Sequence, residues 1–231
     1  MANTEINNWI KYQESGAKQV IVQDIMQFDA IKYIGGLDIS FNKIDNSRGC
    51  AYLSILDLST GQIVYETHQL CQLTVPYCSG FLGFREIPIY KNLIAQAKTE
   101  GWVPDVIMVD GTGILHDRKF GCASHLGVEI DIPTIGVSKT LLCVDGLDEK
   151  AIKNKFRTSC QSKSDSIELV GKSGFIYGLA LKTNALATNP LYVSVGHKIS
   201  LETAKSIVLA TCTYKNPEPI RNSDIKSKLY L

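Results

Sequence analysis

The most constraining feature of the sequence is the apolar run Val106-Ile107-Met108-Val109, which ends on Asp110 and is followed by Gly111-Thr112-Gly113. A short run without a polar position is typical of a central strand that is buried on both faces of a sheet. A helical stretch near residues 121–129 and a strand at Pro133–Val137 follow it. These elements predict a parallel strand–helix–strand unit, with Asp110 at the carboxyl end of its first strand.

Three further strands with short connections precede this unit. They are predicted at Ile31–Phe41, Ala51–Asp57 and Ile63–Leu73, and their close spacing indicates an antiparallel meander. Two more strands are predicted at Phe175–Leu181 and Leu191–Val195. The fold class is therefore α/β, with a mixed central sheet of antiparallel and parallel strands flanked by helices.

Apolar spacing and boundary residues predict the helices. Residues 5–29 have apolar positions at helical spacing, and a second helix is expected to open at Pro88 and to stop at Gly101. Ser200 is a good N-cap for a last helix. Residues 145–170 are polar and are expected to form an exposed connection containing a short helix.

Composition excludes several classes of protein. The 231 residues are 45% apolar, which suits one domain over residues 1–231, and 24 basic against 23 acidic residues give a net charge of +1. This balance excludes a histone-like polycation but permits a local basic face. The basic run Lys150–Lys163 is either a solvated face or a phosphate contact. No apolar run approaches the ~20 residues that span a bilayer, so we expect no membrane partner.

Cysteine usage points to a reducing compartment. The seven cysteines are odd in number and contain no C-x-x-C pair, which favours free thiols. The N-terminal residues 1–8 are polar and carry no secretory segment. We therefore expect a cytoplasmic or nuclear, including nucleolar, protein that is not secreted. Cys122, His125 and His116 lack a convincing fourth ligand, which disfavours zinc.

Three acidic residues occupy positions where a charge is costly. Asp38 lies in the middle of a predicted strand, Asp110 ends the most apolar strand, and Glu86 lies between Phe84 and Pro88. Converging carboxylates of this kind suit Mg²⁺, a hard ion that takes oxygen ligands and can activate water for phosphodiester hydrolysis. Separate local roles are the alternative: a turn residue, a helix N-terminal charge and a backbone hydrogen bond. The residue pattern leaves both interpretations open.

Longer motifs carry a resemblance to a known family. They run in order from about residue 5 to 226 and comprise Gly36–Phe41, Pro76-Tyr77 through Phe84-Arg85-Glu86, Val109–His116, Phe120–Val128, Ile132–Lys139, Tyr192–His197 and Pro217-Glu218-Pro219. Together these motifs closely resemble the endonuclease V family. The resemblance covers nearly the whole chain and implies a ribonuclease H-like fold, in agreement with the strand pattern.

The resemblance also implies a reaction. Endonuclease V enzymes hydrolyse the phosphodiester bond one nucleotide to the 3′ side of inosine, use Mg²⁺ or Mn²⁺, and leave 3′-hydroxyl and 5′-phosphate ends. By similarity, Asp38 and Asp110 are expected to hold the metal and Glu86 to complete the carboxylate set. His197 matches a fourth active-site residue near the metal and its water. Lys139 is expected to contact the scissile phosphate or the attacking water.

The resemblance further implies residues that bind the extruded base. Pro76–Ser79 matches a wedge that fills the gap left by the base, and its Tyr77 ring can stack on neighbouring bases. Small residues would let the backbone approach the purine closely. The expected substrate-binding residues besides Tyr77 are Gly80, Leu82, Gly111, His116, Gly121 and Cys122.

The substrate itself has more than one interpretation. Cys78-Ser79-Gly80 and Cys143–Leu147 resemble eukaryotic members, which favour inosine in single-stranded RNA. The first alternative is a deoxyinosine-specific DNA repair endonuclease, and the second is a non-catalytic inosine-binding protein. Thr112, Ser138 and Asp117 are candidates for contact with a ribose 2′-hydroxyl. We expect the chain to be a monomer.

Overall fold

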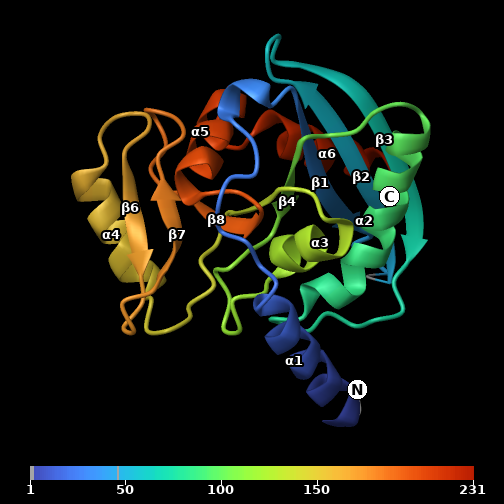
Figure 1. Cartoon of the computed structure of the whole chain (residues 1–231), viewed down its shortest axis with the longest axis horizontal. Coiled ribbons are helices and arrows are strands. Elements are labelled where there is room, and N and C mark those ends of the chain that lie inside the picture. The colour runs from blue at the N-terminus through green and yellow to red at the C-terminus, as the bar shows by residue number, and fades with distance from the viewer. Residues whose placement is uncertain (1–2, 46) are drawn as a thin grey trace.

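An eight-stranded mixed sheet forms the centre of the molecule (Figure 1). The computed structural model describes residues 3–45 and 47–231; Met1 and Ala2, from the polar N-terminal stretch, lie outside the described residues together with Asn46. The strand order is β3-β2-β1-β4-β5-β8-β7-β6. The strands are β1 Tyr33–Phe41, β2 Arg48–Asp57, β3 Gln62–Gln72, β4 Val106–Asp110, β5 Thr134–Ser138, β6 Ser166–Val170, β7 Ile176–Leu181 and β8 Leu191–His197.

The predicted mixed sheet is confirmed. Strands β1, β2 and β3 form the antiparallel meander, whereas β4 is parallel to both β1 and β5. Strand β8 returns antiparallel to β5, and β7 and β6 continue that side of the sheet. The parallel strands β1, β4 and β5 therefore end at the same edge of the sheet, where their last side chains meet.

Helices cover both faces of the sheet (Figure 1). Alternate residues of β4 point to opposite faces: Val106 and Met108 pack with residues of α5 and α6, and Ile107 and Val109 pack with residues of α2 and α3. None of the helices in the described ranges is long and apolar enough to cross a membrane. The helices are α1 Asn3–Ala17, α2 Leu82–Thr99, α3 Cys122–Ile130, α4 Glu149–Ser159, α5 Leu201–Thr211 and α6 Glu218–Ser227, with short 3₁₀ turns at Phe28–Ala30 and Lys228–Tyr230.

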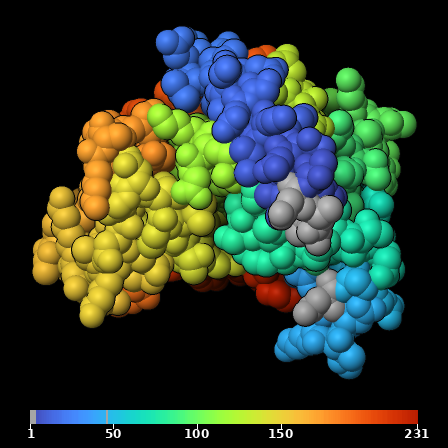
Figure 2. Space-filling view, turned by 90° about the horizontal axis from the view of Figure 1, so that it is seen from below, coloured from blue at the N-terminus to red at the C-terminus, as the bar shows by residue number. Residues whose placement is uncertain are grey.

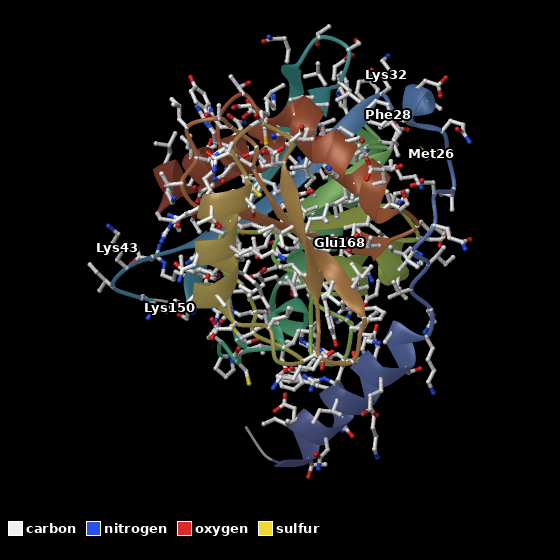
Figure 3. The ribbon with its side chains drawn as sticks, turned by 90° about the vertical axis from the view of Figure 1, so that its left-hand side faces the viewer. Met26, Phe28, Lys32, Lys43, Lys150 and Glu168 are labelled. Atoms are coloured by element: carbon white, nitrogen blue, oxygen red, sulfur yellow. The ribbon has the colours of Figure 1, made fainter. Side chains whose placement is uncertain are left out.

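The predicted connection at 145–170 contains more structure than expected. The short helix is present as α4, but the segment ends in β6, an edge strand that pairs with β7. Leu169 is the only one of the five β6 residues that is buried. Because the other four positions are partly or fully exposed, the sequence of this edge strand resembles that of a polar loop. Figure 3 looks onto this edge of the molecule and shows Lys150 on α4 and Glu168 on β6.

The predicted helix over residues 5–29 is wrong beyond Ala17. Helix α1 ends there, and the following residues form an extended segment that crosses to β8. The Ile21 N–H donates to Nδ1 of His197, and the Ile21 carbonyl accepts from the Lys198 N–H. The apolar residues with helical spacing, such as Val20, therefore pack on the core without forming a helix.

The predicted start of the second helix at Pro88 is also wrong. Helix α2 begins at Leu82, so Pro88 lies inside it and removes one backbone donor. Aromatic contacts stabilise the first turn of α2. The Phe84 ring stacks on the Trp9 ring with 4.9 Å between the ring centroids, and its centroid lies 5.0 Å from that of the His125 ring. Tertiary packing thus extends the helix upstream and places Glu86 within it.

Helix α6 was not predicted, and it is fastened to the sheet by serine side chains. Ser223 Oγ donates to the Gly36 carbonyl at 2.9 Å, and Ser227 Oγ lies 2.7 Å from Ser40 Oγ. The helix passes so close to β1 that a Cβ atom on Gly36 would collide with the backbone of Pro219. Close approach of this kind needs glycine, and it fixes the position of every α6 side chain relative to β1.

We therefore predict that Gly36→Ala destabilises the protein by roughly 1–3 kcal/mol, because the added methyl group must displace α6 from the sheet. The free energy of unfolding from urea titration measures this effect. Gly35→Ala is the matched control, since its Cβ would meet side-chain atoms of Ile107 and Pro104 at 3.3 Å. Equal stability of the two variants would contradict the tight seating of α6.

Candidate active site

Acidic side chains and one lysine meet at the edge where the parallel strands end. Asp110 is the last residue of β4, and Asp38 lies one residue beyond the Leu37–Val109 pair of β1 and β4. Lys139 directly follows β5, and its Nζ lies 3.3 Å from Oδ2 of Asp110. The register of three parallel strands therefore brings together residues that are far apart in sequence.

Asp224 joins this group from α6 and was missed by sequence reasoning. Its Oδ2 lies 3.8 Å from Nζ of Lys139, and its Oδ1 lies 2.7 Å from Nζ of Lys228. The sequence carries a weak signal for this helix. Ser223 and Ser227 are four residues apart, the spacing of side chains on one face of a helix, and Asp224 lies between them.

Glu86 approaches the same region from α2. The side chain is only 2% exposed, and its Oε2 accepts a hydrogen bond of 3.0 Å from the Tyr90 hydroxyl. Burial raises the pKa of Glu86 to about 8, and the nearby charges of Asp38 and Asp110 add to this rise. The three carboxylates singled out in the sequence thus influence one another electrostatically.

Burial and mutual repulsion also perturb the other groups. Burial raises the pKa of Asp38 to about 7, with further contributions from the charges of Asp110 and Asp224. Burial raises the pKa of Asp110 as well, although the Lys139 ammonium opposes the rise. Burial opposes ionisation of Asp224 too, but the Lys228 hydrogen bond and the Lys139 charge outweigh it and lower its pKa.

These residues fit a divalent cation. Asp38 is buried and Asp110 is half-buried, and the charge of Asp110 disfavours the ionised form of Asp38; a hard cation with oxygen ligands would offset that repulsion. Among the described residues, no group of three or more His, Cys, Asp or Glu side chains is arranged to hold a metal ion. Mg²⁺ usually takes one or two carboxylates and keeps several waters, so an incomplete set of protein ligands suits it.

His197 does not lie where the resemblance placed it. It ends β8 and pairs with Thr134 at the start of β5, whereas Asp110 pairs with Val137 near the end of β5. Thr134 and Val137 are three residues apart on β5, so His197 and Asp110 lie roughly 10 Å apart along the strand direction, at a rise of ~3.3 Å per residue. His197 is buried, accepts from the Ile21 N–H and lies 3.8 Å from Asp131, so the structure gives it a role in packing.

A pocket of about 430 Å³ opens beside the acidic group. It brings together Asp110, Lys139 and every residue that the sequence assigned to base binding. Four glycines, at positions 80, 83, 111 and 121, contribute backbone to its wall. Gly80 has φ +80°, a left-handed conformation that favours glycine. The pocket includes Tyr77, Gly80, Leu82, Gly111, His116, Gly121 and Cys122.

Tyr77 stands at the mouth of this pocket. Its side chain is 70% exposed, which is unusual for an aromatic ring that lines a cavity. Thr112 and Ser138, two candidates for ribose contact, also line the pocket, and Ser138 Oγ donates to the Thr140 carbonyl at 2.7 Å. The third candidate, Asp117, is exposed and does not belong to the pocket lining.

Comparison with known proteins identifies the family. The family model described as Endonuclease V matches residues 14–225. Endonuclease V of Homo sapiens and of Mus musculus are each 44% identical to this chain over 206 residues, or 88% of this chain; the match covers 73% of the human and 61% of the mouse protein.

Solved structures agree with this match. The catalytic domain of human Endonuclease V superposes with a TM-score of 0.96 at 39% identity, covering 100% of this chain and 97% of that one. Ciona intestinalis Endonuclease V, bound to DNA containing an inosine followed by a ribo-adenosine, superposes with a TM-score of 0.95 at 29% identity, covering 100% and 98%. The matched fold, the matched sequence and the acidic group beside the pocket agree, and the chain therefore belongs to the endonuclease V family of inosine-specific endonucleases.

Proposed function

We propose that this protein hydrolyses the phosphodiester bond one nucleotide 3′ of inosine in single-stranded RNA, with Mg²⁺ as cofactor and Mn²⁺ able to replace it, leaving 3′-hydroxyl and 5′-phosphate ends. The observation that carries the proposal is the position of Asp110, which belongs both to the acidic group and to the wall of a pocket of nucleobase size. A base held in the pocket would bring its own strand to the carboxylates.

The carboxylates would hold the metal. Asp38 and Asp110 are its ligands, Glu86 completes the set from α2, and Asp224 replaces His197 as the fourth active-site residue. When bound, the divalent ion would polarise the phosphate and lower the pKa of a coordinated water.

Lys139 would hold the phosphate. Burial lowers its pKa, but the charges of Asp110 and Asp224 outweigh burial and raise it, so the ammonium stays protonated. The ammonium group of Lys228 lies beside the same acids, 2.7 Å from Oδ1 of Asp224, so two lysines face this group. This local basic face lies beside the acids despite a net charge of only +1, and it suits a polyanionic strand.

The molecular surface offers a path for the strand. Figure 2 shows the face on which α1 lies, with a hollow between the yellow segment near residue 150 and the light-blue loop near residue 45. Exposed Tyr77 could stack on the neighbours of the extruded base, as a wedge does.

The preference for RNA draws support from one neighbour. The Ciona intestinalis enzyme was crystallised on a strand in which a ribonucleotide directly follows the inosine. Thr112 and Ser138 line the pocket and carry hydroxyl groups of the kind that can contact a ribose 2′-hydroxyl. A deoxyinosine-specific DNA repair activity at the same site is the alternative. A non-catalytic inosine binder is disfavoured, because a binder would not need several repelling carboxylates beside the pocket.

We predict that metal-free protein loses stability as the pH rises from 6.5 to 8.5. The folded protein holds protons on Asp38 and Glu86, with pKa values of about 7 and 8, more tightly than the unfolded chain does. The free energy of unfolding should therefore fall by roughly 1–3 kcal/mol across this window. The pKa values of the buried histidines are lowered, so their titration changes the free energy of unfolding only below about pH 6.5, outside this window.

Calorimetry at the two pH values measures this loss, and added Mg²⁺ should raise Tm more at pH 8.5 than at pH 6.5, since the ion competes with protons. Asp38→Asn should weaken the dependence, leaving the part that Glu86 contributes. Asp45→Asn, in an exposed loop, should leave it intact. A Tm that changes with neither pH nor added Mg²⁺ would contradict the metal assignment.

We predict that Asp110→Asn lowers the cleavage rate on the order of 100-fold or more, because it removes a metal ligand. Affinity for an inosine-containing RNA strand in chelator should stay similar or rise, because the phosphate loses a repelling neighbour. Single-turnover cleavage and fluorescence anisotropy give the two quantities, with Asp29→Asn, an exposed residue of the Phe28–Ala30 turn, as control. Turnover like that of the wild type would exclude Asp110 from the mechanism.

We predict that one ribose decides the RNA preference. In a single-stranded RNA with one inosine, replacing only the ribose on its 3′ side by deoxyribose should slow cleavage by roughly tenfold, the worth of one hydrogen bond of ~1.4 kcal/mol. The same replacement four nucleotides away is the control. An unchanged rate, with equal cleavage of an all-DNA strand, would favour the DNA repair alternative.

A further inference from the structure

Gln13 of α1 forms a wall of the base pocket that the sequence did not single out. Its polar side chain is only 2% exposed. Its Nε2 donates to the Gly80 carbonyl at 2.8 Å and to the Phe120 carbonyl at 3.3 Å, while its Oε1 accepts from Nε of Arg118 at 2.6 Å. These three hydrogen bonds use both amide protons and one of the two acceptor sites of Oε1, so the printed contacts of Gln13 are all to protein groups around the pocket.

These partners come from two separate loops. Gly80 belongs to the segment that carries the wedge tyrosine, and Arg118 and Phe120 belong to the loop between β4 and α3. The guanidinium of Arg118 also lies over the ring of Phe81, 4.7 Å from its centroid. Gln13 and Arg118 together therefore tie the two loops that face each other across the base pocket.

His116 completes the network. Its Nδ1 accepts from the Arg118 N–H at 3.2 Å, so its Nε2 is assigned the proton and donates to the Gly80 carbonyl at 2.8 Å. Burial lowers the pKa of His116, which keeps the ring neutral and this arrangement in place. The Gly80 carbonyl thus accepts from two side chains, and the backbone at Gly80 has a fixed orientation.

Helix α1 is itself held against these loops. Trp9 stacks on Phe84 and meets Phe81 at 5.6 Å, and the Tyr12 hydroxyl donates to Glu129 Oε1 at 2.8 Å. Figure 1 shows the helix extending from the body of the protein, and in Figure 2 it lies against the segments coloured for residues near 80 and 115. Gln13 therefore connects the loops to a rigid support.

We propose that Gln13 is a positioning residue that sets the spacing of the two loops and thereby the selectivity of the pocket for hypoxanthine over guanine. This rests on the proposed function. A backbone wall has no rotamers with which to adjust, so its fit depends on loop spacing. Guanine differs from hypoxanthine by one amino group, and a pocket with loosened walls would admit it. Gln13 lies just before the residues matched by the family model.

The test compares strands that differ in one base. Gln13→Met keeps the length of the side chain and removes its hydrogen bonds. Anisotropy in chelator gives Kd for a single-stranded RNA with one inosine and for the same strand with guanosine there. The ratio of the two Kd values should fall by roughly tenfold. Affinity for a strand with uridine at that position should change by less than about twofold, because phosphate contacts persist. Gln96→Met, an exposed glutamine on α2, should match the wild type.

A second variant and a second measurement keep the inference testable. Arg118→Met leaves Gln13 intact, removes its partner, and should lower the same ratio. Limited trypsin digestion measures how readily the loop between β4 and α3 opens, and it needs no substrate. Cleavage after the exposed Lys119 should be faster in both variants. Equal Kd values of the wild type for inosine and guanosine would refute the proposed function. A normal ratio in folded variants with a loosened loop, or an equal loss for all strands, would refute the role of Gln13.

Discussion

Electrostatic repulsion among buried carboxylates is the constraint on which the rest of the structure depends. Asp38, Asp110 and Glu86 lie in or beside an apolar sheet, and their raised pKa values measure how much the fold disfavours their charges. Lys139 offsets part of this repulsion at 3.3 Å from Asp110. A fold tolerates such a group only if its scaffold cannot relax. The strand register and the close seating of α6 on Gly36 provide that rigidity.

The same rigidity separates two tasks within one site. In the proposed function, side chains from strand ends and from α6 would supply charge for the phosphate, whereas backbone segments around the glycines would shape the pocket for the base. Asp110 belongs to both the acidic group and the pocket wall, and would link base recognition to the reacting bond. The pocket loops are not strands or helices, so they depend on contacts such as those of Gln13 and His116 to keep their spacing. Helix α1, although peripheral in Figure 1, therefore contributes to the site.

Much of the fold could be predicted because local patterns are strong where both faces of a strand are buried. The meander, the parallel unit around Asp110 and the cap at Ser200 all appear as expected. The failures share a cause. The segment after Ala17 keeps helical spacing but pairs with His197, and the helix at Pro88 is extended upstream by aromatic packing. In each case contacts between distant residues outweigh local preference.

The sequence by itself determined which acids are unusual, because a charge in or beside an apolar strand is visible without coordinates. The grouping of Asp38, Asp110 and Lys139 in one site was expected from the family resemblance. Only the tertiary structure showed which further residue joins this group. His197 lies in a motif of the resemblance, but antiparallel pairing carries it to the opposite end of β5. Asp224 lies in an unremarkable polar segment and reaches Lys139 because serine contacts seat α6 on β1. Sequence patterns report local burial, whereas the convergence of α6, β4 and β5 depends on contacts between residues far apart in the chain.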